Sequence, residues 1–141
     1  MIDVVTKKTR SRMMASIPSK NTKPEILVRK SLHSLGFRFR LHQKVCGVRP
    51  DIILPKYRAC IFVHGCFWHR HADCKLASTP KTRHEFWRAK FESNISRDER
   101  VTKQLEINGW NVIVIWECTV RDGSFMEMDF SQLLNGNSEF F

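Results

Sequence analysis

The hydrophobic pattern of the chain begins with one amphipathic helix. Val28, Leu32 and Leu35 recur at spacings of four and three residues, so they share one face of a helix. Thr22 is of a residue type that caps helix N-termini, and Gly36 is suited to end the helix because glycine readily adopts a left-handed conformation. We therefore expect the first helix between Thr22 and Gly36.

The period of the pattern then changes from helical to alternating. Phe37, Phe39 and Leu41 alternate with basic and histidine side chains, which predicts a half-buried strand. Two short apolar runs follow at residues 50–54 and 59–63, separated by PKYR. These runs predict a hairpin of two buried strands, so three antiparallel strands are expected after the first helix.

A second helix and a last strand complete the pattern. Residues 65–81 are irregular, and a helical stretch follows over 82–108, with a candidate break at 93–94. WNVIVIWEC, at residues 110–118, is the most apolar run, which predicts a central strand. The order of helix, three antiparallel strands, helix and further strand in a mixed sheet predicts an α/β fold, with residues 23–141 as a single domain.

Charge is concentrated in the first third of the chain. Residues 1–50 contain 12 Lys and Arg against Asp3 and Glu25, so they hold the whole net charge of +10. Such a concentration is typical of a nucleic-acid-binding arm, although a basic tail kept for solubility has the same composition. We interpret residues 1–22 as a basic DNA-binding arm. Residues 1–23 contain no apolar run that resembles a signal peptide, so we expect a cytosolic protein.

The stretch HGCFWHRHADC, residues 64–74, concentrates residue types that bind metal ions. Cys66, His71 and Cys74 have the spacing C-x4-H-x2-C, and Cys118 at the end of the last predicted strand is placed to complete a tetrahedral zinc site. Buried thiols in a cysteine-rich core are the alternative. Structural zinc stabilises small peptides by roughly 10–16 kcal/mol, enough to order a polar loop, so we favour a structural zinc ion.

Polar residues at the predicted strand ends suit phosphodiester hydrolysis. Asp51 opens the first strand of the hairpin and Val63-His64 closes the second, so the short turn brings these positions together. Glu25, in the first turn of the first helix, is placed to join them. Hydrolysis of this kind commonly uses a divalent cation on oxygen ligands, an activated water and a proton donor for the leaving oxygen.

These positions and three longer stretches resemble known nucleases. An acid in a helix, Pro-Asp at a strand start and a polar cluster ending the next strand resemble the PD-(D/E)xK restriction-endonuclease-like core, with Phe62-Val63-His64 in place of the usual Glu-x-Lys. RPDIILPKYRACIFVHGCFWHRHADC, TRHEFWRAKFESNISRDER and GWNVIVIWEC resemble the very short patch repair endonuclease family over about residues 3–121. The resemblance implies that core with a structural zinc, and an enzyme that nicks duplex DNA at thymine-guanine mismatches.

The resemblance also implies roles for the residues of the site. Asp51 would bind magnesium through its carboxylate, together with the backbone carbonyl of Val63, where the family commonly has Thr. His69 would act as general acid or base and would be oriented by Asp98. The residues that support this site would be His64 and Glu25, and the zinc ligands would be Cys66, His71, Cys74 and Cys118.

Ordinary structural roles stay open for three of these residues. His64 could be a packed strand-end histidine, Glu25 a helix-start carboxylate, and Asp98 a partner of neighbouring arginines. The chain also departs from the family pattern at Arg70 and Ala72, where a run of histidines is found in the family.

Aromatic rings and the basic arm are the expected DNA contacts. Phe67 and Trp68 stand on a loop without room to bury both, and Trp87 follows on the next helix. Rings that wedge between base steps unstack a mismatch more easily than a matched pair. Packing against Phe86 or Phe91 is the alternative for Trp87. By the resemblance, the arm would contact phosphates through Lys7, Lys8, Arg10 and Arg12 and would insert Met13 or Met14.

Three functions follow from these features. The first is a magnesium-dependent, strand-specific endonuclease that nicks mismatched duplex DNA to start very short patch repair. The second is a related nuclease for other mismatched or unmodified sites, and the third is a zinc-stabilised DNA-binding module without catalysis. Asp51, His69 and Asp98 are all present, which favours an enzyme. We expect a monomer, because no apolar stripe requires a partner.

Overall fold

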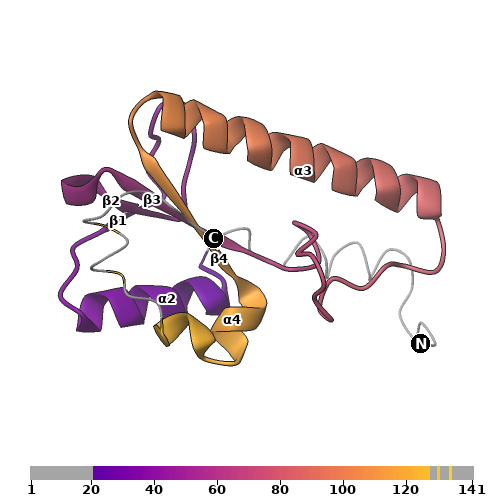
Figure 1. Ribbon diagram of the computed structural model, residues 1–141, viewed down its shortest axis with the longest axis horizontal. Helices are drawn as coiled ribbons and strands as arrows, with labels where there is room; N and C mark the ends of the chain where they lie inside the picture. Colours follow the sequence, from indigo (N-terminus) through magenta and orange to yellow (C-terminus); the bar gives the residue numbers. More distant parts are fainter. Residues whose placement is uncertain (1–20, 128–129, 131–133, 135–141) are drawn as a thin grey trace.

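A computed structural model describes residues 21–127, 130 and 134 and shows a four-stranded mixed sheet between helices (Figure 1). The strand order is β1-β2-β3-β4, in which β1, β2 and β3 are antiparallel neighbours and β4 runs parallel to β3. The predicted order of elements is therefore confirmed. The elements are α2 (Lys23–Ser34), β1 (Arg40–Leu41), β2 (Ile52–Leu54), η1 (Pro55–Tyr57), β3 (Ala59–His64), α3 (His84–Ile107), β4 (Asn111–Trp116), α4 (Glu117–Arg121) and η2 (Ser124–Glu127).

Helix α2 begins where its capping residues predict. The Glu25 N–H donates to Thr22 Oγ1 over 3.4 Å, and Val28 and Leu32 are completely buried in the core. The expectation that Leu35 shares their face is wrong, because its side chain is 60% exposed. The helix ends at Ser34, and Leu35 is its C-cap, so this residue lies beyond the last helical position.

The predicted hairpin is present, whereas the strand before it is much shorter than expected. Strands β2 and β3 pair with Ile52 opposite Ile61, and the 3-10 turn η1 connects them. Strand β1 contains two residues, and His42, with φ of 54°, follows it in a left-handed conformation. Phe37, Phe39 and Leu41 still pack against the core, as their alternation predicts.

Strand β4 lies at an edge of the described sheet, so the prediction of a central strand is wrong. Its apolarity has another cause, because helices cover both faces (Figure 1). Ile113 and Ile115 pack in the core cluster that contains Val28 of α2 and Val120 of α4. Val112 packs with Leu105 of α3 on the opposite side. The strand also ends at Trp116, so Cys118 belongs to α4.

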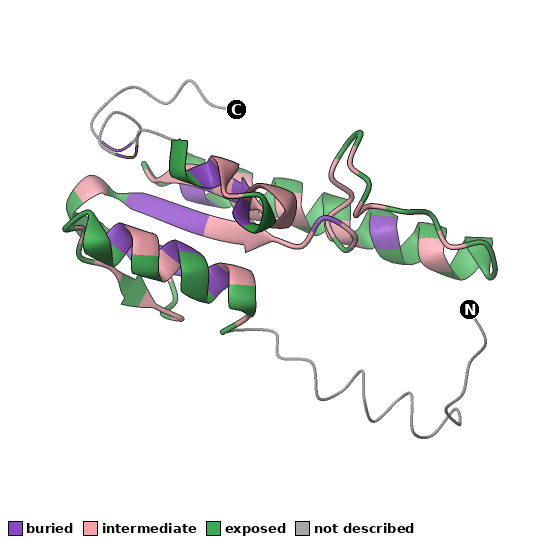
Figure 2. Cartoon of the chain, turned by 90° about the horizontal axis from the view of Figure 1, so that it is seen from below, coloured by how far each residue is buried: buried purple, intermediate pink, exposed green. Residues whose placement is uncertain are grey.

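Helix α3 is continuous through residues 93–94, where a break was a candidate. Its C-terminal part packs on the sheet through Leu105, whereas its N-terminal part extends past the sheet beside the loop of residues 65–83 (Figure 1). Figure 2 shows that most of α3 is exposed and that buried residues gather on the sheet and the helix sides facing it. Within the described residues, no helix combines the length and apolarity needed to cross a membrane.

Candidate active site and metal centre

Parallel pairing of β3 with β4 positions the candidate site. The two strands end at paired residues, His64 and Trp116. The loop of residues 65–83 leaves the sheet beside the start of α4 and leads to the N-terminus of α3 (Figure 1). Residues that are about 50 positions apart in the sequence, such as Cys66 and Cys118, therefore meet at one edge of the fold.

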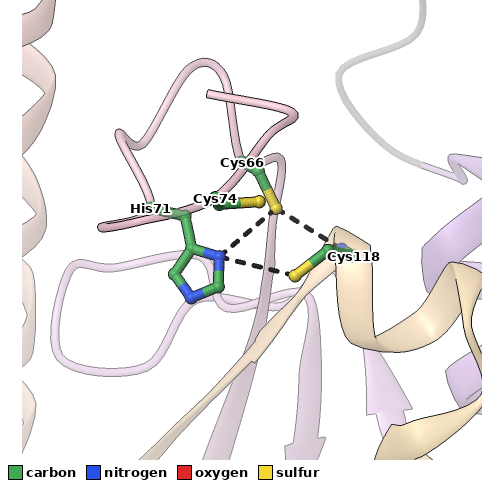
Figure 3. Close-up of side chains that lie close together, drawn as sticks. All are labelled: Cys66, His71, Cys74 and Cys118. Carbon is green, nitrogen blue, oxygen red and sulfur yellow. Dashed lines mark hydrogen bonds between the residues drawn. The ribbon is translucent and has the colours of Figure 1, made fainter. Parts of the chain in front are cut away.

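Four predicted zinc ligands form one cluster at this edge. The donor atoms of Cys66, His71, Cys74 and Cys118 all lie within 4.8 Å of one another (Figure 3). His71 Nδ1 lies 3.7 Å from Cys66 Sγ and 3.4 Å from Cys118 Sγ, and the Cys118 N–H donates to Cys66 Sγ over 3.4 Å. The three residues selected by their spacing, and Cys118, thus lie together in the structure.

The cluster has the chemistry and spacing of a tetrahedral zinc site. Zinc bonds of about 2.3 Å to sulfur and about 2.0 Å to nitrogen place sulfur and nitrogen roughly 3.6 Å apart at neighbouring corners, close to the two distances from His71. Burial raises the pKa of the Cys66 thiol to about 12, so a nearby cation is needed to hold it as a thiolate at neutral pH. These four residues therefore fit zinc.

Two carboxylates meet near the same end of β3. The Val63 N–H donates to Asp51 Oδ2 over 2.8 Å, so within Val63-His64 it is the valine backbone that contacts Asp51. Glu25 is only 3% exposed, and its Oε2 accepts hydrogen bonds from Asn21 N–H and Arg29 Nη2, each over 3.0 Å. Sequence reasoning missed Arg29, although its position four residues after Glu25 on the helix is a recognisable signal.

The electrostatics of Asp51 favour binding of a cation. Burial raises the pKa of the Asp51 carboxyl to about 6, the Val63 N–H opposes that rise, and the Glu25 carboxylate adds to it. A divalent cation relieves this repulsion and prefers oxygen ligands. The Asp51 carboxylate therefore fits a divalent cation.

A histidine-carboxylate pair lies beside this carboxylate pair. His69 Nδ1 is 2.6 Å from Asp98 Oδ2, which joins the loop to α3. The His64 ring stacks on His69 with centroids 3.9 Å apart and planes within 4°. Burial lowers the pKa of His64 to about 4, and the charge of His69 adds to this effect. His64 is therefore neutral at pH 7, and the three donor groups lie close enough to hold an ion themselves.

The predicted wedge residues gather around the N-terminal half of α3. Phe67 contacts Trp68, Trp87 and Phe91, with ring centroids 5.1, 5.5 and 5.3 Å apart respectively. Trp87 also stacks on Phe91, with ring centroids 5.6 Å apart, so the packing expected as the alternative role of Trp87 is present on one side of its ring. Trp68 is 38% exposed. Phe86 is 48% exposed, so it is a further surface ring that the sequence analysis does not identify. Its position beside Trp87 on a polar helix is the signal that could indicate it.

The arm residues lie outside the described part of the chain. This applies to the whole set of predicted arm contacts, Lys7, Lys8, Arg10, Arg12, Met13 and Met14.

Comparison with known proteins identifies the family. The model of the family described as DNA mismatch endonuclease Vsr matches residues 2–76. A "Type II nicking enzyme V.XorIIP" from Xanthomonas oryzae pv. oryzae is 42% identical over 96% of this chain and 98% of its own length. The "DNA mismatch endonuclease Vsr" of Escherichia coli is 41% identical over 86% of this chain and 77% of its own length.

A solved structure supports the fold. The "Homing Endonuclease I-Bth0305I Catalytic Domain" aligns with a TM-score of 0.55 and 20% identity, over 79% of this chain and 93% of that chain. At this identity the likeness concerns the fold alone, and it agrees with the expected nuclease-like sheet. The family match and the identity with curated relatives establish that the chain belongs to the DNA mismatch endonuclease Vsr family and is a DNA endonuclease.

Proposed function

We propose that the protein nicks one strand of duplex DNA at thymine-guanine mismatches, in a magnesium-dependent reaction that starts very short patch repair. The printed names of the relatives, a mismatch endonuclease and a nicking enzyme, support this reaction type. The observation that carries the proposal is that two consecutive residues of β3, Val63 and His64, contact the two groups of proposed catalytic residues. Val63 contacts Asp51, and His64 stacks on the His69 ring that binds Asp98.

Asp51 is the proposed magnesium ligand, together with the backbone carbonyl of Val63, and Glu25 supports this site. A bound magnesium ion would stabilise negative charge on the phosphate and lower the pKa of a water molecule. The buried Glu25 carboxylate raises the local negative potential, and Arg29 holds it in place through the 3.0 Å contact.

His69 is the proposed proton-transfer residue. Its Nδ1 is occupied by Asp98, which leaves Nε2 to exchange a proton with water or with the leaving oxygen. The stacked His64 ring fixes the plane of His69 and, because it is neutral at pH 7, adds no positive charge beside it. Asp98 thus acts as a positioning residue from α3.

The cluster of Cys66, His71, Cys74 and Cys118 is the proposed structural zinc site. Zinc in such a closed site supplies folding energy and no reactive position. Its ligands tie the loop to α4, and the same loop carries the aromatic ring of Trp68.

Aromatic wedges and the basic arm are the proposed means of recognising the mismatch. Trp68, Phe67 and Trp87 would press into the base stack at the lesion, where unstacking is less costly than in matched DNA. The arm of residues 1–22, with the cations Lys7, Lys8, Arg10 and Arg12, would hold the phosphate backbone. Mismatched double-stranded DNA is thus the proposed substrate of a monomeric enzyme.

A nicking assay tests the proposed function. End-labelled duplexes carrying each mismatch, and one matched duplex, are incubated with the protein and Mg²⁺, with Asp51→Ala as the inactive control. We expect a single-strand nick at thymine-guanine that is faster than at any other pair. Equal cleavage of matched DNA would instead support the related-nuclease alternative, and binding without any cleavage would support the non-catalytic module.

A further inference from the structure

The loop of residues 65–83 contains many polar residues and must hold aromatic rings in a fixed place. Its backbone contains turns and three left-handed residues, Arg70 with φ of 53°, Asp73 with φ of 55° and Arg83 with φ of 55°. Its backbone bonds from His69 N–H to the Gly65 carbonyl and from His71 N–H to the Cys66 carbonyl are local. The cysteine-histidine cluster fixes one side of the loop, so the side that carries the rings needs other contacts.

The side chain of Arg70 supplies such contacts. Its Nη1 donates to the Phe67 carbonyl over 3.4 Å and to the Ser78 carbonyl over 3.0 Å, and its Nη2 donates to Thr79 Oγ1 over 3.3 Å. One guanidinium thus connects the segment that carries the rings with the segment that returns toward α3. The planar, multi-donor shape of guanidinium suits several acceptors at once.

The same guanidinium packs on the aromatic cluster. Its carbon lies 4.1 Å from the Phe91 ring centroid and 5.7 Å from the Phe67 ring centroid. Phe91 is only 8% exposed and belongs to α3, so the contact attaches the loop to the helix. Asn94 of α3 adds a second attachment, because its Nδ2 donates to the Trp68 carbonyl over 3.1 Å.

We propose that Arg70 is a positioning residue that locks Phe67 and Trp68 in a preformed wedge and thereby sets the discrimination between mismatched and matched DNA. This inference rests on the proposed function, and it deepens it by assigning the discrimination to a residue of the loop that carries the rings. Arg70 acts through the loop, because its donors are engaged by loop acceptors.

Rigidity of the wedge provides the selectivity. A fixed ring can enter the base stack only if the bases give way, and a matched pair resists this more than a mismatch does. A loosened loop swings aside, so matched DNA is accommodated without unstacking. Loss of the Arg70 contacts therefore removes a penalty against the wrong substrate, which is how many specific sites discriminate.

The test compares Arg70→Gln and Arg70→Lys with the wild type. The measured quantity is the ratio of kcat/KM for thymine-guanine duplex over matched duplex, with kcat and KM determined separately. We expect Arg70→Gln to lower this ratio by about tenfold, mainly by lowering KM for matched DNA, because it loses three hydrogen bonds and the ring contact. Arg70→Lys keeps the charge but loses the fork of donors, so its ratio should lie in between, lowered about threefold.

Arg83→Gln is the matched control. Arg83 lies over the Phe86 ring at 4.5 Å near the start of α3, so its loss removes the same charge close by and leaves the Arg70 contacts in place. Its ratio should equal that of the wild type. Tryptic cleavage after Lys75 and Lys81 reports loop order independently of DNA, and it should be faster in both Arg70 variants than in Arg83→Gln.

Unchanged discrimination in both Arg70 variants, with zinc content and tryptic rates equal to the wild type, would overturn the inference. Should Arg70→Gln lose zinc, the lysine variant decides, and a wild-type ratio in it would also overturn the inference. A wild type that does not prefer thymine-guanine contradicts the proposed function instead. The tryptic rates still test the hold of Arg70 on the loop in that case, and equal rates in all proteins would overturn it.

Discussion

At the scale of single residues, Asp51 destabilises the fold that it serves. Burial and the neighbouring Glu25 carboxylate raise the pKa of Asp51 to about 6, so its ionised form is disfavoured in the folded protein. The stability that the protonated group contributes is present below about pH 4 and is lost as the pH rises through 6. Such a strained carboxylate is typical of a functional site, where a cation compensates for it.

Asp51→Asn should therefore stabilise the magnesium-free protein at pH 7 while it abolishes nicking. The free energy of unfolding should rise by about 1–3 kcal/mol at pH 7 and by little at pH 4, because the amide carries no charge. Urea unfolding at the two pH values measures this difference. Glu106→Gln, an exposed carboxylate of α3, is the control and should change stability little at either pH. Equal stability of Asp51→Asn and the wild type at pH 7 would contradict this reading.

Some site contacts follow from the sequence and others do not. The spacing of Cys66, His71 and Cys74 predicts their convergence, because ligands two to five residues apart in a loop must lie close together. The pairing of His69 with Asp98 joins residues 29 positions apart, and it came from the family resemblance. The contacts of Arg70 depend on the path of an irregular loop, which no periodicity encodes.

At the scale of elements, the loop between β3 and α3 joins the two proposed metal functions. Its cluster residues meet α4, its His69 meets α3, and its rings lie along α3. Cys118, which comes from a separate element, contacts this loop at Cys66 and His71. Zinc binding should therefore matter for the position of the proposed catalytic histidine as well as for folding.

Cys118→Ser should lose zinc and destabilise the domain, because a serine hydroxyl is a poor zinc ligand at neutral pH. We expect the bound zinc to fall from about one ion per chain toward zero, with a loss of at least about 2 kcal/mol in unfolding free energy. Elemental analysis and thermal unfolding measure both. The exposed Cys46, changed to Ser, is the control and should retain zinc. A stable and fully active Cys118→Ser protein would rule out the ligand set.

The hydrophobic pattern predicts which segments are buried, and only in part where each element lies. The stripe of Val28 and Leu32 predicts α2, and the short apolar runs predict β2 and β3, because one buried face imposes each period. The apolar run of β4 predicts a central strand, and this is wrong, since an apolar run indicates burial on both faces and helices provide that burial at an edge of the sheet. The same stripe wrongly predicts that Leu35 is buried, because the period does not show where the helix ends, and Leu35 is the C-cap.

At the scale of the whole molecule, the excess positive charge lies in the first third of the sequence, whereas Asp51, His69 and Asp98 follow it. Residues 51–141 carry no net charge, since the first 50 residues hold the entire excess of +10. Affinity for the phosphate backbone should thus come mainly from the first third of the chain, and selection of the lesion from the loop and α3.

Deletion of residues 1–18 should weaken DNA binding and flatten its dependence on salt. The deletion removes Lys7, Lys8, Arg10 and Arg12, and each lost phosphate contact reduces the slope of log affinity against log salt by about 0.9. We expect the slope to become shallower by about 2–4. Thermal unfolding should change little, because the sequence of residues 1–18 carries too little apolar surface to form part of a core. An unchanged slope would exclude the arm from phosphate binding.

The central claim is that Asp51 holds a divalent cation at the bond to be cut. The most direct measurement is a crystal structure of the protein with a thymine-guanine oligonucleotide in Mn²⁺, where anomalous scattering locates the ion in place of Mg²⁺. We expect a peak bonded to the Asp51 carboxylate and the Val63 carbonyl, within about 2.0–2.3 Å of each and of a phosphate oxygen. A bound duplex with the Asp51 carboxylate turned away from every cation would contradict the account.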